Sequence, residues 1–321
     1  MSKTNSRKIS EPRSNKSLFV PTLLSIALLS AFSSSAIAAN SGGEDDVFED
    51  SWGQTSYGNH VNLTDRNVII NEGFESTVIV YGAYTDENDR VVSDNMVTAS
   101  GAAVTTGYFP SSFFGGSARV INTDGNATTQ TNQNTVSISD ANTDSVKGGE
   151  SYASTSNGDA SAEANNNTVT ISQSTVARVH GGNISASSNH RNVASQANGN
   201  TVAIGNSEIK AQVAGAHLNA TADNGEAQAE ANDNIVTISS NSTVGSTSVA
   251  ENVYGAIVAA SGNTVTAHTD LNTVTVTDST ITGDLFGGNV GAYGISTTAN
   301  ANHNTVIVTD STITGSVFGG N

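Results

Sequence analysis

A phrase of eighteen residues returns almost unchanged near the end of this chain, and this repetition limits the possible folds more than any other feature. The two clearest copies span residues 272–289 (NTVTVTDSTITGDLFGGN) and 304–321 (NTVIVTDSTITGSVFGGN), which differ at three of eighteen positions. Their opening pattern, Asn-x-Val-x-Ile or Val, recurs in full or weaker form at eight asparagines: Asn59, Asn95, Asn134, Asn167, Asn200, Asn234, Asn272 and Asn304. Successive asparagines are 32 to 39 residues apart. A repeat of this length predicts a stacked array, in which each unit packs against its neighbours.

Each unit carries the pattern of short β-strands. Over residues 273–277 (TVTVT) polar and apolar side chains alternate strictly, as in a strand with one buried face, and Thr and Val are β-branched residues that favour strands. A second strand is expected over 281–286, ending at a Gly-Gly pair that permits a positive φ and a sharp corner. Small-residue stretches such as 160–164 (ASAEA) lack a 3.6-residue period and favour a third strand. We expect one coil of two or three strands per unit, with two smaller coils as an open alternative.

These units together predict an all-β fold: a parallel β-helix, or β-solenoid, of about eight coils with a period of 32–39 residues. Equivalent Val and Ile side chains are expected to lie over one another in inward ladders, with Thr and Asn ladders covering the outside. The composition favours ladders over a thick core, because only 5% of the residues are aromatic. The chain contains no cysteine, so regular hydrogen bonds rather than disulfides must hold it together.

The first 38 residues have the parts of a secretory signal peptide. A basic, polar segment (1–17) precedes a 15-residue apolar run (18–32), and small residues follow up to AIA at 36–38, which predicts cleavage after Ala38. A transmembrane helix is the alternative, but it needs about 20 apolar residues, and this run is shorter and contains Pro21. We therefore expect an exported protein, located at the cell surface or outer membrane, or secreted.

The charge of the remaining chain excludes one class of partner. After residue 38 the chain holds seven Lys and Arg against 28 Asp and Glu, a net charge of −21. Such a charge repels the phosphates of nucleic acids and anionic lipid headgroups. Nucleic acid is therefore not expected as a partner.

The signal peptide, the NTVTVTDSTITGDLFGGN-type repeats and the absence of cysteine together resemble the passenger region of Gram-negative autotransporters, which use type V secretion. The repeats are similar in style to those of autotransporter adhesins, closely over residues 134–321 and loosely over 59–114. The resemblance implies a C-terminal β-barrel that carries the passenger across the outer membrane. No series of amphipathic strands of about ten residues is evident in the sequence. We expect that the chain is truncated before the barrel or is secreted by another route.

Three regions follow from this interpretation: a signal peptide (1–38), an acidic flexible linker with a candidate N-terminal cap (39–57), and β-solenoid passenger repeats that are truncated at the C-terminus (58–321). The expected function is that of a non-catalytic structural or adhesive passenger. It would present a repetitive polar surface to a host cell, to matrix or to a neighbouring bacterium. The outer membrane would be a partner only through the missing barrel.

No catalytic, cofactor-binding or metal-binding residue is assigned from the sequence. The phrase Gly115-Gly116-Ser117 lacks the context of a G-x-S-x-G elbow and is interpreted as a corner. His180 and His217 follow one another at the Gly corners of neighbouring coils, so they are expected to come close, as solvated side chains rather than metal ligands. The acidic clusters at 45–46 and 86–89 lack the spacing of a calcium loop. The chain has six histidines: His60, His180, His190, His217, His268 and His303.

Two other function classes stay open. A polysaccharide-active β-helix enzyme would need a pair of fixed carboxylates, but the acids are scattered, and Asp278 and Asp310 repeat at one place in their units, which indicates a turn. An ice-binding solenoid would need an unbroken outward row of Thr-x-Thr. Residues 275–277 fit that row, whereas 137–139 and 203–205 interrupt it.

Overall fold

The computed structural model describes residues 45–48, 67–70, 79–101, 112–246 and 248–321, with side chains described from residue 67 onward. Within them the chain is an all-β, parallel β-solenoid of about seven turns without helices, as the repeats predict. The opening phrase of the first expected unit, at Asn59, lies outside the described residues, as does the expected signal peptide. No helix long and apolar enough to cross a bilayer occurs in the described part.

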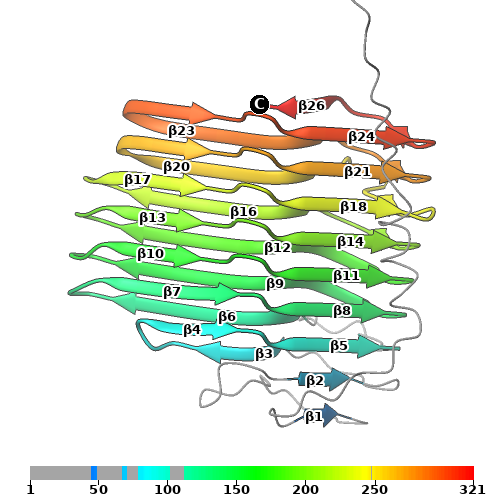
Figure 1. Ribbon diagram of the computed structural model, residues 1–321, viewed down its shortest axis with the longest axis horizontal. Coiled ribbons are helices and arrows are strands. Elements are labelled where there is room, and N and C mark those ends of the chain that lie inside the picture. The colour runs from blue at the N-terminus through cyan, green and yellow to red at the C-terminus, as the bar shows by residue number, and fades with distance from the viewer. Residues whose placement is uncertain (1–44, 49–66, 71–78, 102–111, 247) are drawn as a thin grey trace, which may run out of the picture. The chain divides into compact units, whose positions relative to one another are not determined.

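One strand of each turn belongs to a nine-stranded parallel sheet (Figure 1). From β5 onward it is the strand that follows the opening asparagine of the repeat. The first strand lies within the segment expected to be a linker (39–57) and pairs in parallel with the second. The strands of this sheet are β1 (Asp45–Phe48), β2 (Asn67–Ile70), β5 (Met96–Ser100), β8 (Thr135–Ser139), β11 (Thr168–Ser172), β14 (Thr201–Gly205), β18 (Ile235–Ser239), β21 (Thr273–Thr277) and β24 (Thr305–Thr309).

The rest of each turn lies in a 17-stranded sheet. Its long strands contain the Gly-Gly or Gly-Ala pair: β3 (Ile79–Thr85), β6 (Ser112–Asn122), β9 (Asn142–Thr155), β12 (Thr175–Ser188), β16 (Val213–Ala222), β20 (Val253–His268), β23 (Leu285–Asn300) and β26 (Val317–Gly320). Two-residue strands precede the later ones: β15 (Glu208–Ile209), β19 (Thr243–Val244), β22 (Thr280–Ile281) and β25 (Thr312–Ile313). The third segment of the turn is β4 (Arg90–Ser93), β7 (Ala127–Asn132), β10 (Ala160–Glu163), β13 (Val193–Gln196) or β17 (Glu226–Glu230), and in the last turns it merges into β20 and β23. Each repeat is thus one coil of three segments.

The predicted ladders of Val and Ile are confirmed. Strand pairing places equivalent residues of successive coils side by side throughout the nine-stranded sheet. Full burial of one such side chain stabilises the fold by about 1.5–3 kcal/mol, so each added coil contributes its own share. The first of these ladders comprises Val97, Val136, Val169, Val202, Val236 and Val274, all with no exposed surface.

The core of the described residues consists of two large apolar clusters, with two small ones beside them, rather than of one spine. One cluster is built from Val and Ile of the nine-stranded sheet and of the start of the long strands, such as Val146 and Val179. The other is rich in alanine and lies between the later half of the long strands and the third segment, as with Ala153 and Ala162. Small side chains suffice there because the facing segments of one coil lie close together.

A buried ladder of asparagines separates the two clusters, and this corrects the expectation that the asparagines at the start of the repeats face outward. From Asn95 to Asn304, the side-chain Nδ2 of each donates a hydrogen bond to the Oδ1 of the next at 2.9–3.1 Å. The same Oδ1 accepts a second bond from the backbone N–H of the preceding asparagine. Asn134, Asn167 and Asn200 have no exposed surface. A buried amide is tolerated because its hydrogen-bonding atoms find partners.

The Gly pairs serve this ladder rather than a turn. Neither Gly148 nor Gly149 has a positive φ, so the expectation of a positive-φ corner is wrong. A Cβ on Gly148 would lie 2.7 Å from Cβ of Asn167 and 2.5 Å from a backbone oxygen of the next coil, and a Cβ on Gly149 would lie 2.7 Å from Nδ2 of Asn167. Glycine is required here because the asparagine occupies the space of a side chain.

Positive φ angles occur instead at two turns of the coil. One lies directly before the ladder asparagine, at Asp94, Gln133, Asn166, Gly199, Asp233, Leu271 and His303. The other follows the strand of the nine-stranded sheet and includes Asp278 (φ 48°) and Asp310 (φ 47°). The interpretation of these two repeated acids as a turn position is thereby confirmed. Asp and Asn tolerate this left-handed conformation better than most residues.

Candidate binding corner

The residue directly before each Gly pair forms a column along one corner of the solenoid, and we call it the corner column. Strand register places its members side by side in successive coils. Unlike the interior ladders, this column does not repeat one residue type. Its members are Tyr81, Phe114, Lys147, His180, Ala214, Tyr254, Phe286 and Phe318.

A second column faces it, formed by the residue directly after each pair, and we call it the facing column: Tyr84, Ser117, Glu150, Asn183, His217, Ile257 and Asn289. The chain bends at the glycines, so side chains of the two columns touch across the corner. The rings of Tyr81 and Tyr84 lie 5.4 Å apart, and Lys147 forms an ion pair with Glu150. The corner is therefore a surface on which two columns of varied side chains converge.

Stacked aromatic rings occupy both ends of the corner column. Tyr81 and Phe114 stack at 5.0 Å between ring centres, and the Nζ of Lys147 lies 5.0 Å from the centre of the Phe114 ring. At the other end Tyr254 and Phe286 stack at 5.0 Å with nearly parallel planes. Such contacts add to the stability that burial of the rings provides.

Polar side chains fill the middle of the corner and form a connected network. Nδ2 of Asn183 donates to Oε1 of Glu150 at 3.1 Å, and Oδ1 of Asn183 accepts from Nδ1 of His217 at 3.2 Å. Nε2 of His180 lies 3.2 Å from Oε1 of Gln212. This network joins a carboxylate, an amide and an imidazole from three successive coils.

The two histidines meet as the sequence predicts, with ring centres 5.1 Å apart. His180 is only 3% exposed, however, so the expectation that it is solvated is wrong. Burial, and then the neighbouring His217 and Lys147, hold the pKa of His180 well below its ordinary value. Burial, followed by Lys147 and Arg178, also lowers the pKa of His217. No group of three His, Cys, Asp or Glu suited to a metal ion occurs among the described residues.

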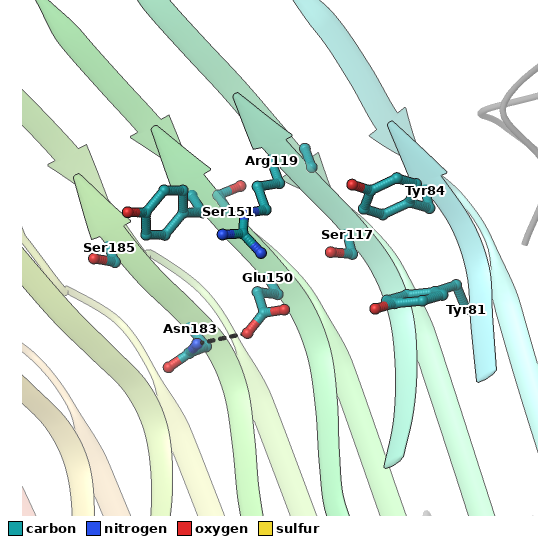
Figure 2. Close-up of a pocket in the computed structure, with 10 residues that line it drawn as sticks. Tyr81, Tyr84, Ser117, Arg119, Glu150, Ser151, Asn183 and Ser185 are labelled. Atoms are coloured by element: carbon teal, nitrogen blue, oxygen red, sulfur yellow. Dashed lines mark hydrogen bonds between the residues drawn. The ribbon is translucent and has the colours of Figure 1, made fainter. Parts of the chain in front are cut away.

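The corner deepens into a cavity of about 510 Å³ beside the first coils, the corner cavity (Figure 2). Its walls come from four successive long strands, β3, β6, β9 and β12. Figure 2 shows Tyr81 and Tyr84 on one side of the Arg119 guanidinium, and Asn183 and Ser185 on the other. The volume lies within the usual range of small-ligand sites.

Aromatic and hydrogen-bonding groups share this cavity. Burial, and then the charge of Glu150, raises the pKa of Tyr81 to about 12, so its phenol keeps its proton at neutral pH. The guanidinium carbon of Arg119 lies 5.1 Å from the centre of the Tyr152 ring. No carboxylate forms an ion pair with Arg119 in the described part of the chain. Glu150 is the only carboxylate among the described residues that line the cavity, whereas hydrolysis of glycosides commonly uses two.

Other candidates from the sequence lie apart from one another. Ser117 lies in β6 and lines the cavity, but within the described residues no hydrogen bond joins it to a histidine. The acidic cluster at 86–89 is exposed between β3 and β4, and Glu87 pairs there with Arg90 at 3.5 Å. His60 and the side chains of 45–46 lie outside the described residues. The remaining histidines occupy other turns or strands: His190, His268 and His303.

Alignment of the repeats on their opening asparagine does not bring the residues of the corner cavity together. Alignment on the Gly pairs instead would have placed Tyr81, Lys147 and His180 in one column, with Tyr84, Glu150 and His217 close to it. A position whose residue type varies between otherwise similar repeats is the sequence signal that indicates such a site. Comparison of the chain with protein-family models, curated proteins and solved structures finds no match.

Proposed function

We propose that this protein is an exported, non-catalytic passenger of the autotransporter type, whose solenoid holds an adhesive corner away from the cell. The observation that carries the proposal is the contrast between seven nearly identical interiors and one outer corner that differs from coil to coil. Repetition is what a rigid support needs, because each coil adds stability through its neighbours. Variation on a supported surface is what recognition needs.

The N-terminal sequence supports the export part of this proposal. Residues 1–38 carry the basic segment, the apolar run and the small residues before the cut that a secretory signal peptide has. The hydrogen-bonded asparagine ladder also suits an exported chain, since it stabilises the fold without cysteine in an oxidising compartment.

The corner supports the adhesive part. Rings of Tyr81 and Tyr84, together with amides and charged groups, lie on a surface built by extended strands rather than by long loops. Aromatic residues and arginine contribute most to binding at protein surfaces, and a rigid support reduces the entropy lost on binding. The expected partner is a host cell, matrix or the surface of a neighbouring bacterium.

Export and attachment can be tested separately. When the full chain is expressed in a Gram-negative host, we expect mass spectrometry of the exported protein to show an N-terminus at Ala39. Beads coated with the purified protein are then expected to attach to animal cells, matrix or bacteria more than beads coated with albumin. Retention in the cytoplasm with an intact N-terminus would contradict export, and equal attachment of both bead types would contradict adhesion.

A further inference from the structure

Two of the few positive charges of this chain lie at the corner cavity. Only six Lys and Arg occur in the described residues: Arg90, Arg119, Lys147, Arg178, Arg191 and Lys210. Arg119 lines the cavity, Lys147 lies in the corner column, and Lys147 and Arg178 are both close enough to lower the pKa of His217. Two of the six described cations, Arg119 and Lys147, therefore lie at one site, in a chain that carries 28 acidic side chains after residue 38.

One of these cations is available to a ligand. Lys147 is paired with Glu150, whereas Arg119 is exposed and has the Tyr152 ring as its neighbour, with no carboxylate paired to it among the described residues. A guanidinium presents a planar fork of N–H groups that matches a carboxylate with two parallel hydrogen bonds. The cavity thus offers one unmatched positive charge, held against an aromatic ring.

The other groups of the cavity match hydroxyls and a flat apolar face. Tyr81 and Tyr84 present rings whose phenols stay protonated, because burial raises the pKa of both. Glu150 provides acceptor oxygens, and Asn183 is fixed by its bonds to Glu150 and His217. Aromatic faces next to planar polar side chains suit a sugar ring, which has C–H groups on its faces and hydroxyls around its edge.

We propose that the corner cavity binds a carboxylate-bearing sugar of an acidic polysaccharide. Arg119 pairs with the carboxylate, the rings of Tyr81, Tyr84 and Tyr152 pack against the sugar, and Glu150 accepts hydrogen bonds from its hydroxyls. An acidic peptide such as tetraglutamate fits less well, because it has no hydroxyl to donate to Glu150 and no ring to pack against the tyrosines. This inference rests on the proposed adhesive function and names the ligand of that surface.

The direct test is calorimetric titration of the purified protein with a tetramer of galacturonic acid, beside a neutral tetramer of galactose. We expect the acidic tetramer to bind at least tenfold more tightly than the neutral one. The Arg119→Gln variant should lose at least tenfold in affinity for the acidic tetramer and change little for the neutral one. Arg119 is exposed, so the variant should melt at the same temperature as the parent.

Arg191→Gln is the matched control, because Arg191 is also exposed and the substitution removes the same charge in a turn after β12. Its affinity for the acidic tetramer should stay within twofold of the parent. Tyr152→Leu should weaken binding of the acidic tetramer, since it removes the ring beneath Arg119. Equal losses in Arg119→Gln and Arg191→Gln would overturn the proposal, since they would indicate unspecific attraction.

Further outcomes separate this inference from the proposed function. Absence of binding by tetramers of both galacturonic and glucuronic acid, or tighter binding of tetraglutamate, would overturn the inference. Coated beads that attach equally with and without the Arg119→Gln substitution would show adhesion through another surface. Binding of the acidic tetramer at the cavity without any attachment of beads would support the sugar site and contradict the adhesive function.

Discussion

The buried asparagine ladder and the corner column run side by side along the same coils, yet their residues follow opposite patterns. From Asn95 to Asn304 the ladder keeps one residue in every coil, because both its donor and its acceptor bond to the next coil. Separated from it only by the Gly pair, the corner column changes from tyrosine to lysine to histidine. Interior positions of this solenoid accept one residue, and the corner accepts many.

The difference shows where function can be placed on such a chain. A substitution in the ladder removes hydrogen bonds to two neighbouring coils, whereas equivalent places of the corner column hold side chains that range from alanine to phenylalanine. The contact between the asparagine and the Gly pair also explains why the repeats keep Asn at their start and Gly-Gly at their end. The asparagine and the glycines of the preceding coil fill one volume between them.

The largest effect is expected for Gly148→Ala. The added Cβ would lie 2.5 Å from the backbone oxygen of Gly181 and 2.7 Å from Cβ of Asn167, and backbone cannot move away cheaply. We expect a loss of about 4 kcal/mol or more in stability, among the large values for single substitutions. Ser185→Ala, on the outer face of the same sheet, is the control and should change the midpoint of urea unfolding very little. Similar midpoints for the two variants would contradict the shared-volume explanation.

A smaller loss is expected for Asn167→Ala. The backbone N–H and Nδ2 of Asn134 would both lose their acceptor in the interior, at a cost of about 3 kcal/mol for the two groups. Asn165→Ala removes one comparable bond, to the backbone N–H of Asn198, at a half-buried position where water can replace it, so about 1 kcal/mol is expected. Urea unfolding measures the free energy of unfolding of both variants. Equal losses would mean that the buried ladder contributes no more stability than a half-buried hydrogen bond.

The corner itself should respond to acid through His180. Its pKa is lower in the folded state than the ordinary 6.5, so the unfolded chain binds more protons below pH 6.5 and stability falls as the pH drops from there. We expect His180→Phe to reduce the loss of stability between pH 7.5 and pH 5. Thermal melts at pH 7.5 and pH 5 measure this loss of stability. The control is His190→Phe, at an exposed turn. If His180→Phe and the parent lost the same stability between pH 7.5 and pH 5, the conclusion that His180 is buried and neutral would be contradicted.

The smallest expected effect is a gain at Leu271. This residue has a φ of 60° directly before the ladder asparagine, where the equivalent positions carry Asp, Gln, Asn, Gly and His. Because the left-handed conformation strains a leucine, Leu271→Asn should stabilise the protein by about 0.5–1 kcal/mol. Leu271→Ala keeps the strain and should give no such gain. A lower melting temperature for Leu271→Asn would contradict this reading of the turn.

The period and the alternation of residues were sufficient to predict the strands. Val274 and Val276 alternate with threonines over a β-branched run, and in the fold the valines are buried while the threonines lie on the outer face. Register followed from the repeat, because shifting a strand by one residue would turn its Val side chains outward. The turn role of Asp278 was also readable, since its counterpart recurs 32 residues later at Asp310.

The parts that could not be predicted depend on contacts between coils. An asparagine such as Asn167 is usually exposed, and only the stacking of identical amides shows that its polar atoms can be satisfied in the interior. Glycine was taken for a sign of unusual φ, whereas Gly148 is needed because Asn167 fills the space of its side chain. The corner cavity joins residues of four coils, and its members carry no motif along the chain.

The central claim is that each repeat forms one coil stacked in parallel register on the next. A disulfide tests it directly, because the chain contains no cysteine of its own. Ser154 and Ser187 are register partners of β9 and β12, and their Oγ atoms lie 2.9 Å apart on the outer face. Oxidation of the variant with Cys at both positions should produce nearly complete cross-linking within the chain, measured by mass spectrometry. The pair at Ser154 and Ser185, two residues out of register and therefore about 7–8 Å apart, should not cross-link. Equal cross-linking of both pairs, or none in either, would contradict the stacked coils.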